Sequence, residues 1–221
     1  MGRVYDFHTH TFLSDGELIC SEQIRHAQAH YYRAIAITDH VDASNIDFVL
    51  NSLIKFIETE KKYFEDIEII SGVELTHVPP ILINDLAKYA KEKGAQIVVV
   101  HGETIVEPVF KGTNYYAVRS KYVDILAHPG VISEEDVKEA VSNDIFLELS
   151  ARKGHSLANG HVSKLCQKFG AKLLVNSDAH GPGDFLEYEF ALKVAVSAGL
   201  SYENAREIIE NNPKLLLKRC F

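Results

Sequence analysis

The first residues in the chain that could do chemistry are two histidines and an aspartate close to its start. His8 and His10 are one residue apart in the run DFHTHTFLSDG, and Asp15 follows in the same run. Alternate residues of an extended chain face the same side, so both imidazoles can reach one metal ion. Imidazole nitrogen and carboxylate oxygen together suit Zn²⁺, Mn²⁺ or Fe²⁺. The pair is a weak signal by itself, because a lone histidine at a strand end is more often hydrogen-bonded in a loop or core.

Side chains of the same types follow later apolar runs. The predicted metal ligands are His8, His10, Asp15, His40, Glu74, His101, His128, Asp178 and His180. A carboxylate can bridge two ions about 3.5–4 Å apart through its two oxygens. Nine ligands are too many for one ion and fit two or three. Because ligand types follow six separate strands, chance is a poor explanation, and the sequence predicts a cluster of two or three divalent ions (Zn, Mn or Fe).

Seven short apolar runs are predicted to be the strands that position these residues, with helical patterns between them. Their ranges are residues 4–7, 34–38, 67–73, 96–100, 123–127, 145–149 and 172–175. The runs are apolar on both faces, which is typical of a parallel sheet covered by helices. Seven strand–helix units in 221 residues favour a closed α/β barrel over an open sheet, and the first turn lacks the GxGxxG of dinucleotide-binding folds. All strand ends of a parallel barrel meet at one face, where active sites are built.

Capping residues mark where several helices are expected to begin. The predicted N-caps are Ser21, Ser133 and Ser201. The last helix is expected to end before the Asn-Asn-Pro run at residues 211–213, since proline often follows a helix end. The longest irregular stretch, residues 102–120, is a candidate functional loop because long loops at strand ends often carry function.

Composition limits the classes of function. The formal net charge is −8 without a block of Lys and Arg, which disfavours nucleic acid as the main partner. No apolar run approaches the length of a membrane span, and the first is too short and too broken for a signal peptide, so a cytoplasmic protein is expected. Three widely separated cysteines without a CxxC indicate free thiols. The oligomeric state stays open.

The residues that follow the sixth strand are candidates for contacting a substrate: Arg152, Lys153 and His155. Arg152 is preferred because a guanidinium binds phosphate through two N–H groups at once. Lys153 is a weaker candidate, since adjacent side chains usually diverge. Glu148 is expected to orient a metal ligand from behind, and Asn159 is expected either to cap the next helix or to touch the ligand.

The remaining histidines are not predicted to bind metal. His26 and His30 are four residues apart on the first predicted helix, and we expect them to be solvated on the outside of the barrel. His77 is expected to rim the pocket because it follows Glu74 closely. Either His155 or His161 is a candidate for touching the substrate.

Taken together, these motifs resemble the PHP family (polymerase and histidinol phosphatase). The matching residues run from position 8 to position 180 and are His8-x-His10, Ser14-Asp15-Gly16, Thr38-Asp39-His40, Gly72-Val73-Glu74, His101, Ala127-His128-Pro129 and Ser177-Asp178-Ala179-His180. The resemblance implies a distorted (β/α)7 TIM-like barrel, a single PHP domain over residues 1–221, and metal-dependent hydrolysis of phosphoesters. No polymerase portion is present, so the chain looks like a free-standing, histidinol-phosphatase-like member.

The resemblance also implies three metal positions. The first ion would take His8, His10, Glu74 and Asp178. The second would share Glu74 and take His101 and His128. The third would take Asp15, His40 and His180. Some relatives have His at the position of Asp15, a change that keeps a ligand but leaves the identity of the third ion open.

The expected function is that of a phosphatase acting on a small phosphomonoester, such as histidinol phosphate or a nucleotide, through a metal-activated hydroxide. The expected catalytic residues are Glu74, His40, His180 and Asp15, the last three as candidates to help the leaving group. One alternative is a PHP-type nuclease or phosphodiesterase on short nucleic acids, although the chain lacks a basic channel. Another is a non-catalytic metal-binding module. An amidohydrolase would normally need a bridging lysine after a middle strand, and no predicted strand ends in Lys.

Overall fold

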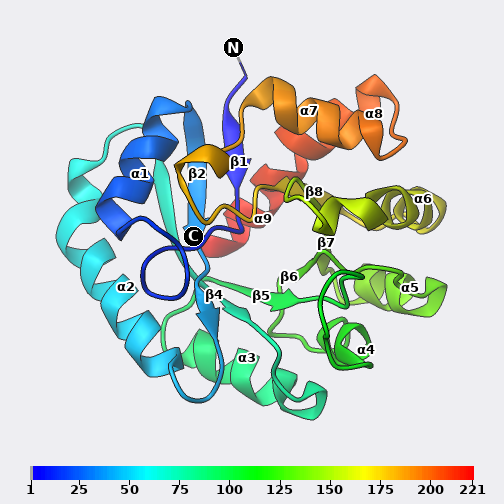
Figure 1. Ribbon diagram of the computed structural model, residues 1–221, viewed down its shortest axis with the longest axis horizontal. Helices are drawn as coiled ribbons and strands as arrows, with labels where there is room; N and C mark the ends of the chain where they lie inside the picture. Colours follow the sequence, from blue (N-terminus) through cyan, green and yellow to red (C-terminus); the bar gives the residue numbers. More distant parts are fainter. Residues whose placement is uncertain (1) are drawn as a thin grey trace.

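The computed structural model describes residues 2–221, and its centre is a sheet of parallel strands ringed by helices (Figure 1). The strands pair in the order β1-β2-β4-β5-β6-β7-β8, and the short β3 pairs with β4. Their bounds are β1 Val4–Asp6, β2 Tyr32–Ile37, β3 His40–Val41, β4 Glu68–Leu75, β5 Ile97–His101, β6 Ile125–Ala127, β7 Phe146–Ser150 and β8 Leu173–Asn176. All seven predicted strands are confirmed, and the two-residue β3 is added after the second of them.

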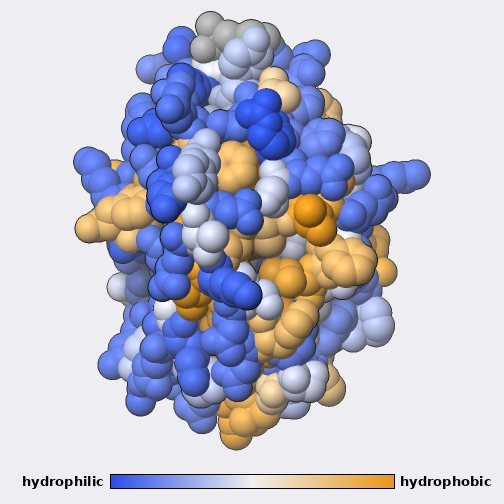
Figure 2. All heavy atoms as spheres, turned by 90° about the vertical axis from the view of Figure 1, so that its left-hand side faces the viewer, coloured by the Kyte–Doolittle hydropathy of each residue, from blue (hydrophilic) through white to orange (hydrophobic). Residues whose placement is uncertain are grey.

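Most of the helices cover the outside of the sheet and bury an apolar stripe against it. Their bounds are α1 Cys20–Ala29, α2 Ile46–Glu60, α3 Ile83–Glu92, α4 Thr113–Ala117, α5 Glu134–Ser142, α6 Asn159–Phe169, α7 Tyr188–Ser197, α8 Tyr202–Glu210 and α9 Asn212–Cys220. Helix α2, for example, buries Val49, Leu50 and Leu53. Figure 2 shows the side of the molecule on which α1 and α2 lie, where hydrophilic side chains predominate and apolar ones show between them. None of the helices within residues 2–221 has both the length and the apolar character of a membrane span.

The sheet is nearly closed into a barrel, and the seam between its edge strands closes at the carboxyl ends. The Asn176 side chain accepts a hydrogen bond from the Phe7 backbone N–H at 3.0 Å. Beyond the strands, Asp178 N–H donates to the His8 carbonyl at 3.0 Å and His10 N–H donates to the Ala179 carbonyl at 2.8 Å. The seam therefore brings the start of the chain beside the turn that follows β8. This distorted α/β barrel is the fold class expected from the sequence.

The interior of the barrel is a separate small apolar cluster. Alternate residues of the strands supply it, among them Ala34 and Ala36 of β2 and Ile97 and Val99 of β5. This spacing follows the two-residue repeat of a strand. Leu216 of α9 joins the same cluster, and so α9 packs against the interior of the barrel.

Helix α9 was missed by the prediction that the last helix ends before residues 211–213. Pro213 lies in the first turn of α9, where its missing N–H has no helical partner to lose. Hydrogen bonds tie α9 to the strand starts: Asn212 donates to the Leu173 carbonyl at 2.8 Å, and Gln96 donates to the Cys220 carbonyl at 2.8 Å. The helix therefore closes the end of the barrel opposite the carboxyl ends of the strands.

Two of the three predicted N-caps are confirmed. Ser133 accepts from the N–H of Asp136 at the start of α5, and Ser201 accepts from the N–H of Asn204 at the start of α8. The prediction for Ser21 is wrong, because α1 begins one residue earlier and its N-cap position is Ile19. The hydroxyl of Ser21 instead donates to Glu60 at 2.7 Å, which joins α1 to α2.

Replacing Asn176 by Ala tests the seam. The fully buried Asn176 amide also donates to Glu148 at 2.9 Å, so its loss deprives both the Phe7 N–H and the Glu148 carboxylate of a partner. We expect the free energy of unfolding to fall by about 2–3 kcal/mol. The measurement is urea denaturation in the presence of a chelator, so that metal binding adds nothing.

The matched control for that experiment is Asn51→Ala, at an exposed position of α2. It should change the free energy of unfolding by less than about 0.5 kcal/mol. Equal effects of the two substitutions would show that the Asn176 hydrogen bonds do not hold the seam.

Candidate metal centre

The carboxyl ends of the strands surround a cavity of about 260 Å³. It is lined by Asp15, His40, Thr76, His77, His101, Glu107, His128, Arg152, His155, Asp178 and His180. Six of the nine predicted ligands line this cavity, and the other three, His8, His10 and Glu74, are fully buried in contact with them. The barrel therefore brings all nine predicted side chains together.

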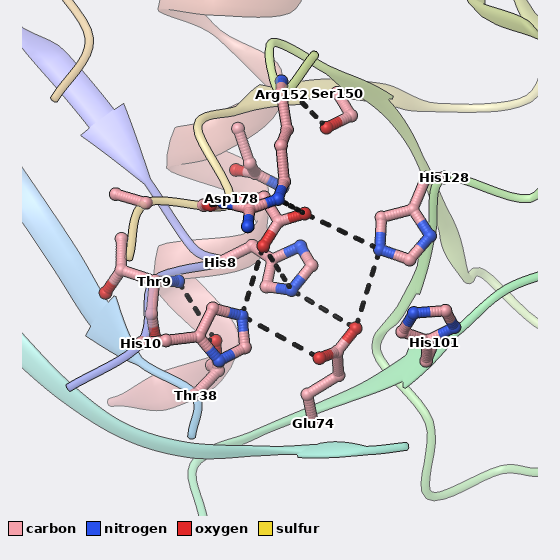
Figure 3. Close-up of polar contacts among 12 residues, drawn as sticks. His8, Thr9, His10, Thr38, Glu74, His101, His128, Ser150, Arg152 and Asp178 are labelled. Carbon is pink, nitrogen blue, oxygen red and sulfur yellow. Dashed lines mark hydrogen bonds and ion pairs between the residues drawn. The ribbon is translucent and has the colours of Figure 1, made fainter. Parts of the chain in front are cut away.

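The Glu74 carboxylate, near the end of β4, faces four imidazoles. His40 is the nearest, with Nδ1 2.6 Å from Glu74 Oε2, and Figure 3 shows the other three. Glu74 Oε1 lies 3.2 Å from His8 Nε2 and 3.7 Å from His128 Nε2, and its Oε2 lies 3.7 Å from His10 Nε2. Since both carboxylate oxygens point at imidazole nitrogens, Glu74 occupies the middle of the cluster and is placed to bridge two ions.

Asp178 faces His8, His10 and His128 from the turn after β8. Its Oδ1 lies 3.3 Å from His10 Nε2 and 3.8 Å from His8 Nε2, and its Oδ2 lies 3.8 Å from His128 Nε2. Burial raises the pKa of Asp178 to about 7. A bound cation would act in the opposite direction and favour the ionised carboxylate.

Two residues of the cluster have unusual backbone conformations. Asp178 has φ 56° and His128 has φ 25°, both on the left-handed side that non-glycine residues seldom occupy. Such conformations cost of order 1–3 kcal/mol each and persist where surrounding structure enforces them, most often at functional sites. The side chains at these two positions face the cluster: His128 lies against Glu74, and Asp178 lies against His8 and His10.

Several buried nitrogens and oxygens of the cluster have no hydrogen-bond partner within residues 2–221. They are Nε2 of His8, both ring nitrogens of His10, Oε1 of Glu74 and Nδ1 of His128. His8 Nε2 and Glu74 Oε1 satisfy the distance of an ion pair but not the geometry of a hydrogen bond. Leaving such groups unsatisfied costs about 1–3 kcal/mol each, whereas two ligand atoms on one ion lie about 3.0–3.5 Å apart. These unpaired nitrogen and oxygen atoms are therefore placed as ligands of divalent cations would be.

The pKa values of two imidazoles favour the neutral form that binds metal. Burial lowers the pKa of His10 well below its usual value, and the nearby His40 adds to this effect. Burial likewise lowers the pKa of His128 well below its usual value, helped by His101. Metal ligands must be deprotonated, so both rings are prepared to bind a cation.

Glu148, on β7, fixes the orientation of His8. Its Oε2 lies 2.8 Å from His8 Nδ1, which directs Nε2 of the same ring toward Glu74. Burial lowers the pKa of His8, but the Glu148 and Glu74 carboxylates outweigh burial and raise it well above its usual value. A carboxylate behind a ligating histidine is a common arrangement in metal sites, and the structure places Glu148 where the sequence analysis expects an orienting residue.

A second group lies on the outer side of the cluster. Asp15 Oδ1 is 3.5 Å from His40 Nε2 and 3.3 Å from His180 Nε2. The loop that carries Asp15 is held by the buried Asp39, whose Oδ1 accepts from the Thr11 N–H and the Ser14 hydroxyl, each at 2.7 Å. Asp39 therefore sets the span between His10 and Asp15.

The predicted substrate residues differ in how close they lie to the cluster. Arg152 lines the cavity, donating to the Asp178 carbonyl at 3.0 Å, and its Nη1 lies 2.9 Å from His180 Nδ1. His155 also lines the cavity and stacks on His128 with ring centroids 4.1 Å apart. Lys153 is exposed and lines a neighbouring hollow, which also includes Arg152 and His180.

The other polar residues singled out in the sequence have structural partners. Asn159 does not cap α6, because its side chain pairs with both the N–H and the carbonyl of Ser150. His161 contacts the Ile132 carbonyl at 2.7 Å and does not line the cavity. His77 lines the cavity rim as expected.

His26 and His30 lie on the outer helix α1 as expected, but they are only partly exposed to solvent. Both rings are half-buried and stack on Phe185, with centroid separations of 5.5 and 5.6 Å. Phe185 comes from the segment before α7, a long-range contact that the spacing of the histidines on α1 cannot reveal.

Glu107 is a cavity residue that the sequence analysis did not select. It lies in the long loop after β5, with Oε2 2.9 Å from His101 Nε2 and 3.5 Å from His77 Nε2. The contact with His101 lowers the pKa of Glu107 to about 2. The only sequence signal was the length of the loop that carries it.

Ligand-type side chains in the described chain meet in groups whose candidate ligand atoms all lie within 4.8 Å of one another. The groups are His8–His10–Glu74, His8–His128–Asp178, Glu74–His101–His128, His10–Asp15–His40–His180 and His77–His101–Glu107. Four of the five consist entirely of predicted ligands, and the fifth adds His77 and Glu107.

A family model described as the PHP domain matches residues 6–216. The chain belongs to the PHP family. An uncharacterized protein of Methanocaldococcus jannaschii is 51% identical to it over 215 residues, which is 97% of this chain and 99% of that protein. A probable phosphatase of Thermoanaerobacter sp. is 28% identical over 223 residues, which is 91% of this chain and 89% of that protein.

The fold of this PHP domain is also found among solved structures. A chain in the cryo-EM structure of archaeal ribonuclease P with mature tRNA aligns with a TM-score of 0.70 at 16% identity, covering 96% of this chain and 90% of that chain. At this identity the likeness shows the fold alone. PHP membership, the phosphatase-named relative and the His/Asp/Glu groups together support a metal-dependent phosphoesterase.

Replacing Glu148 by Gln tests whether the cluster binds metal as its geometry indicates. Loss of the charge behind His8 should weaken the binding of Mn²⁺ by about 10–100-fold, because partners that orient a ligating histidine tune its affinity. The measurement is a Mn²⁺ titration followed by the EPR signal of the free ion, with circular dichroism to confirm the fold.

The control is Glu135→Gln, an equal change of charge at an exposed position of α5. It should leave the Mn²⁺ affinity unchanged. An unaltered affinity in Glu148→Gln would contradict the role given to Glu148.

Proposed function

We propose that this PHP domain is a phosphatase that hydrolyses a small phosphomonoester with the help of two or three divalent ions. The observation that supports it most directly is the convergence of nine imidazole and carboxylate side chains, several with unsatisfied buried atoms, at one cavity. A purely structural cluster of this kind would bury lone pairs against one another at considerable cost.

The proposed ligand sets are those that the family resemblance implies, and they overlap the groups of neighbouring ligand atoms. The first ion would be held by His8, His10, Glu74 and Asp178, the second by Glu74, His101 and His128, and the third by Asp15, His40 and His180. Zn²⁺, Mn²⁺ and Fe²⁺ all suit imidazole and carboxylate ligands. When bound, such ions supply Lewis-acid activation of water and neutralise charge on the phosphate oxygens.

The chain's own residues would bind and orient the substrate around these positions. Arg152 is proposed to bind phosphate, since it lines the cavity, with Lys153 and His155 as further substrate contacts. His40, His180 and Asp15 lie on the open side of the cluster, where a leaving alkoxide would emerge. One of these three side chains would give the alkoxide its proton or hold it. Glu74, at the centre, is proposed to be essential because it touches both inner groups.

A small substrate is favoured by the size of the cavity and by the charge of the chain. The cavity of about 260 Å³ lies just below the usual range for small-molecule sites, which begins at about 300 Å³. The net charge of −8 offers no general attraction to a long polyanion. Histidinol phosphate and nucleoside monophosphates are therefore the first substrates to test.

The test of the proposed function compares phosphomonoesters with a nucleic acid on one enzyme preparation. Histidinol phosphate, nucleoside monophosphates and a labelled oligonucleotide are assayed with Zn²⁺, Mn²⁺ or Fe²⁺ added in turn. We expect phosphate release from a monoester, loss of activity with a chelator, and no turnover by Glu74→Gln although its fold is retained. Activity on the oligonucleotide alone would indicate a nuclease. Full activity of metal-free protein, or inactivity on every substrate with every ion, would contradict the proposal.

The proposed role of Arg152 is tested by Arg152→Ala and Arg152→Lys. Losing a charged hydrogen-bond donor to phosphate should lower kcat/KM by about 10–100-fold, mostly through KM, in Arg152→Ala. Arg152→Lys should recover part of the loss, because it keeps the charge without the two-pronged geometry. Arg25→Ala, at an exposed position of α1, is the control. Unchanged KM and kcat in Arg152→Ala would show that the assignment is wrong.

A further inference from the structure

Glu107 is a carboxylate on the rim of the cavity that approaches three imidazoles at once. Its Oε2 lies 2.9 Å from His101 Nε2 and 3.5 Å from His77 Nε2, and its Oε1 lies 3.4 Å from His155 Nε2. The first distance matches the separation of two atoms that share one ion, about 3.0 Å for neighbouring ligands at about 2.1 Å from the metal. Glu107 is therefore in range of whatever ion His101 holds.

The loop is built to place this carboxylate. The Glu103 carboxylate accepts from the N–H groups of Gly112 and Asn114, both at 3.0 Å, which fastens the two ends of the loop together. The Asn114 side chain accepts from the N–H of Glu103 at 3.0 Å and donates to the Pro129 carbonyl at 2.8 Å. The segment between these fastened ends projects over the cavity and carries Glu107.

A close approach of backbones fixes the base of the same loop. Gly130 has φ 59°, and a Cβ at that position would lie 1.9 Å from the Glu103 carbonyl oxygen. Only glycine fits there, so the strand-end turn that carries His128 and the loop that carries Glu107 are held against each other. Glu107 and His128 therefore approach the second ion position as parts of one assembly.

Glu107 itself is not locked in place as Glu74 is. Its side chain is 37% exposed, whereas that of Glu74 is fully buried. The residues before it, Ile105 and Val106, are 54% and 47% exposed. A ligand on an exposed loop can leave without disturbing the barrel, which a buried ligand on a central strand cannot do.

We propose that Glu107 is a displaceable ligand of the second ion position, formed by Glu74, His101 and His128, and that the phosphate of the substrate takes its place. The inference rests on the proposed function, because it needs an ion at that position and an anionic substrate. The Glu107 carboxylate and the substrate phosphate are both anionic oxygen ligands and would compete for one open coordination site. The carboxylate would then bind the ion in the free protein. Only an anion that binds the ion more tightly than Glu107 does would displace it.

Glu107→Gln tests this, with Glu58→Gln as the matched control at an exposed position of α2. Mn²⁺ binding is followed by EPR, and inorganic phosphate is then titrated calorimetrically into protein saturated with Mn²⁺. We expect Glu107→Gln to weaken one Mn²⁺ site by about tenfold or more, the scale seen when a supporting ligand is lost. At saturating Mn²⁺ it should bind phosphate about fivefold more tightly, since a competing charge near the site is gone.

Three results would overturn the inference: unchanged Mn²⁺ binding in Glu107→Gln, phosphate binding equal to or weaker than that of the wild type, or the same shifts in Glu58→Gln. These outcomes differ from a failure of the proposed function. A wild-type protein that binds no Mn²⁺ would contradict both, whereas a wild-type phosphatase with a silent Glu107→Gln would contradict this inference alone.

Discussion

Glu74 and Asp178 are buried carboxylates whose oxygens face imidazole nitrogens at 2.6–3.8 Å. In a dry interior this arrangement is costly, because the facing atoms are largely lone pairs and few of them are hydrogen-bonded. A divalent cation removes the conflict, since every one of these atoms can then point at positive charge. The rest of the molecule can be understood as the scaffold that holds these side chains in an arrangement they would not adopt unaided.

The scaffold acts through buried polar contacts more than through the ligands themselves. Glu148 holds His8 from behind, and Asn176 links Glu148 to the first strand across the seam. Asp39 holds the loop between His10 and Asp15. On the opposite end of the barrel α9 packs Leu216 into the interior. The seam, the loop and the closing helix thus fix the geometry, while the side chain of Glu107 is partly exposed at the rim of the cavity.

The sequence predicted the strands and the converging ligands because both leave local signals. Buried parallel strands appear in the sequence as short apolar runs. A ligand that directly follows such a run can be placed at the common face of the barrel once the strand is recognised. His8, Glu74 and His128 were found in this way from positions far apart in the chain. The orienting role expected for Glu148 followed from its place just before the end of the predicted strand, and the structure places it against His8.

The features that the sequence did not reveal depend on contacts between segments far apart in the chain, or on a side chain having two possible hydrogen-bond partners. Pro213 suggested a helix end, but tertiary packing of Leu216 favours a new helix there. His26 and His30 stack on Phe185. Asn159 hydrogen-bonds to the backbone of Ser150 and does not cap its own helix. Glu107 is one acidic residue in a long loop, and only the folded loop shows that it reaches His101.

The central claim is that the buried cluster is a metal centre, and anomalous diffraction from crystals grown with Mn²⁺ tests it most directly. The account predicts anomalous peaks between Glu74, Asp178 and the imidazoles of His8 and His10, and beside His101 and His128. Well-ordered crystals with Mn²⁺ present and no anomalous peak within bonding distance of Glu74 would contradict it.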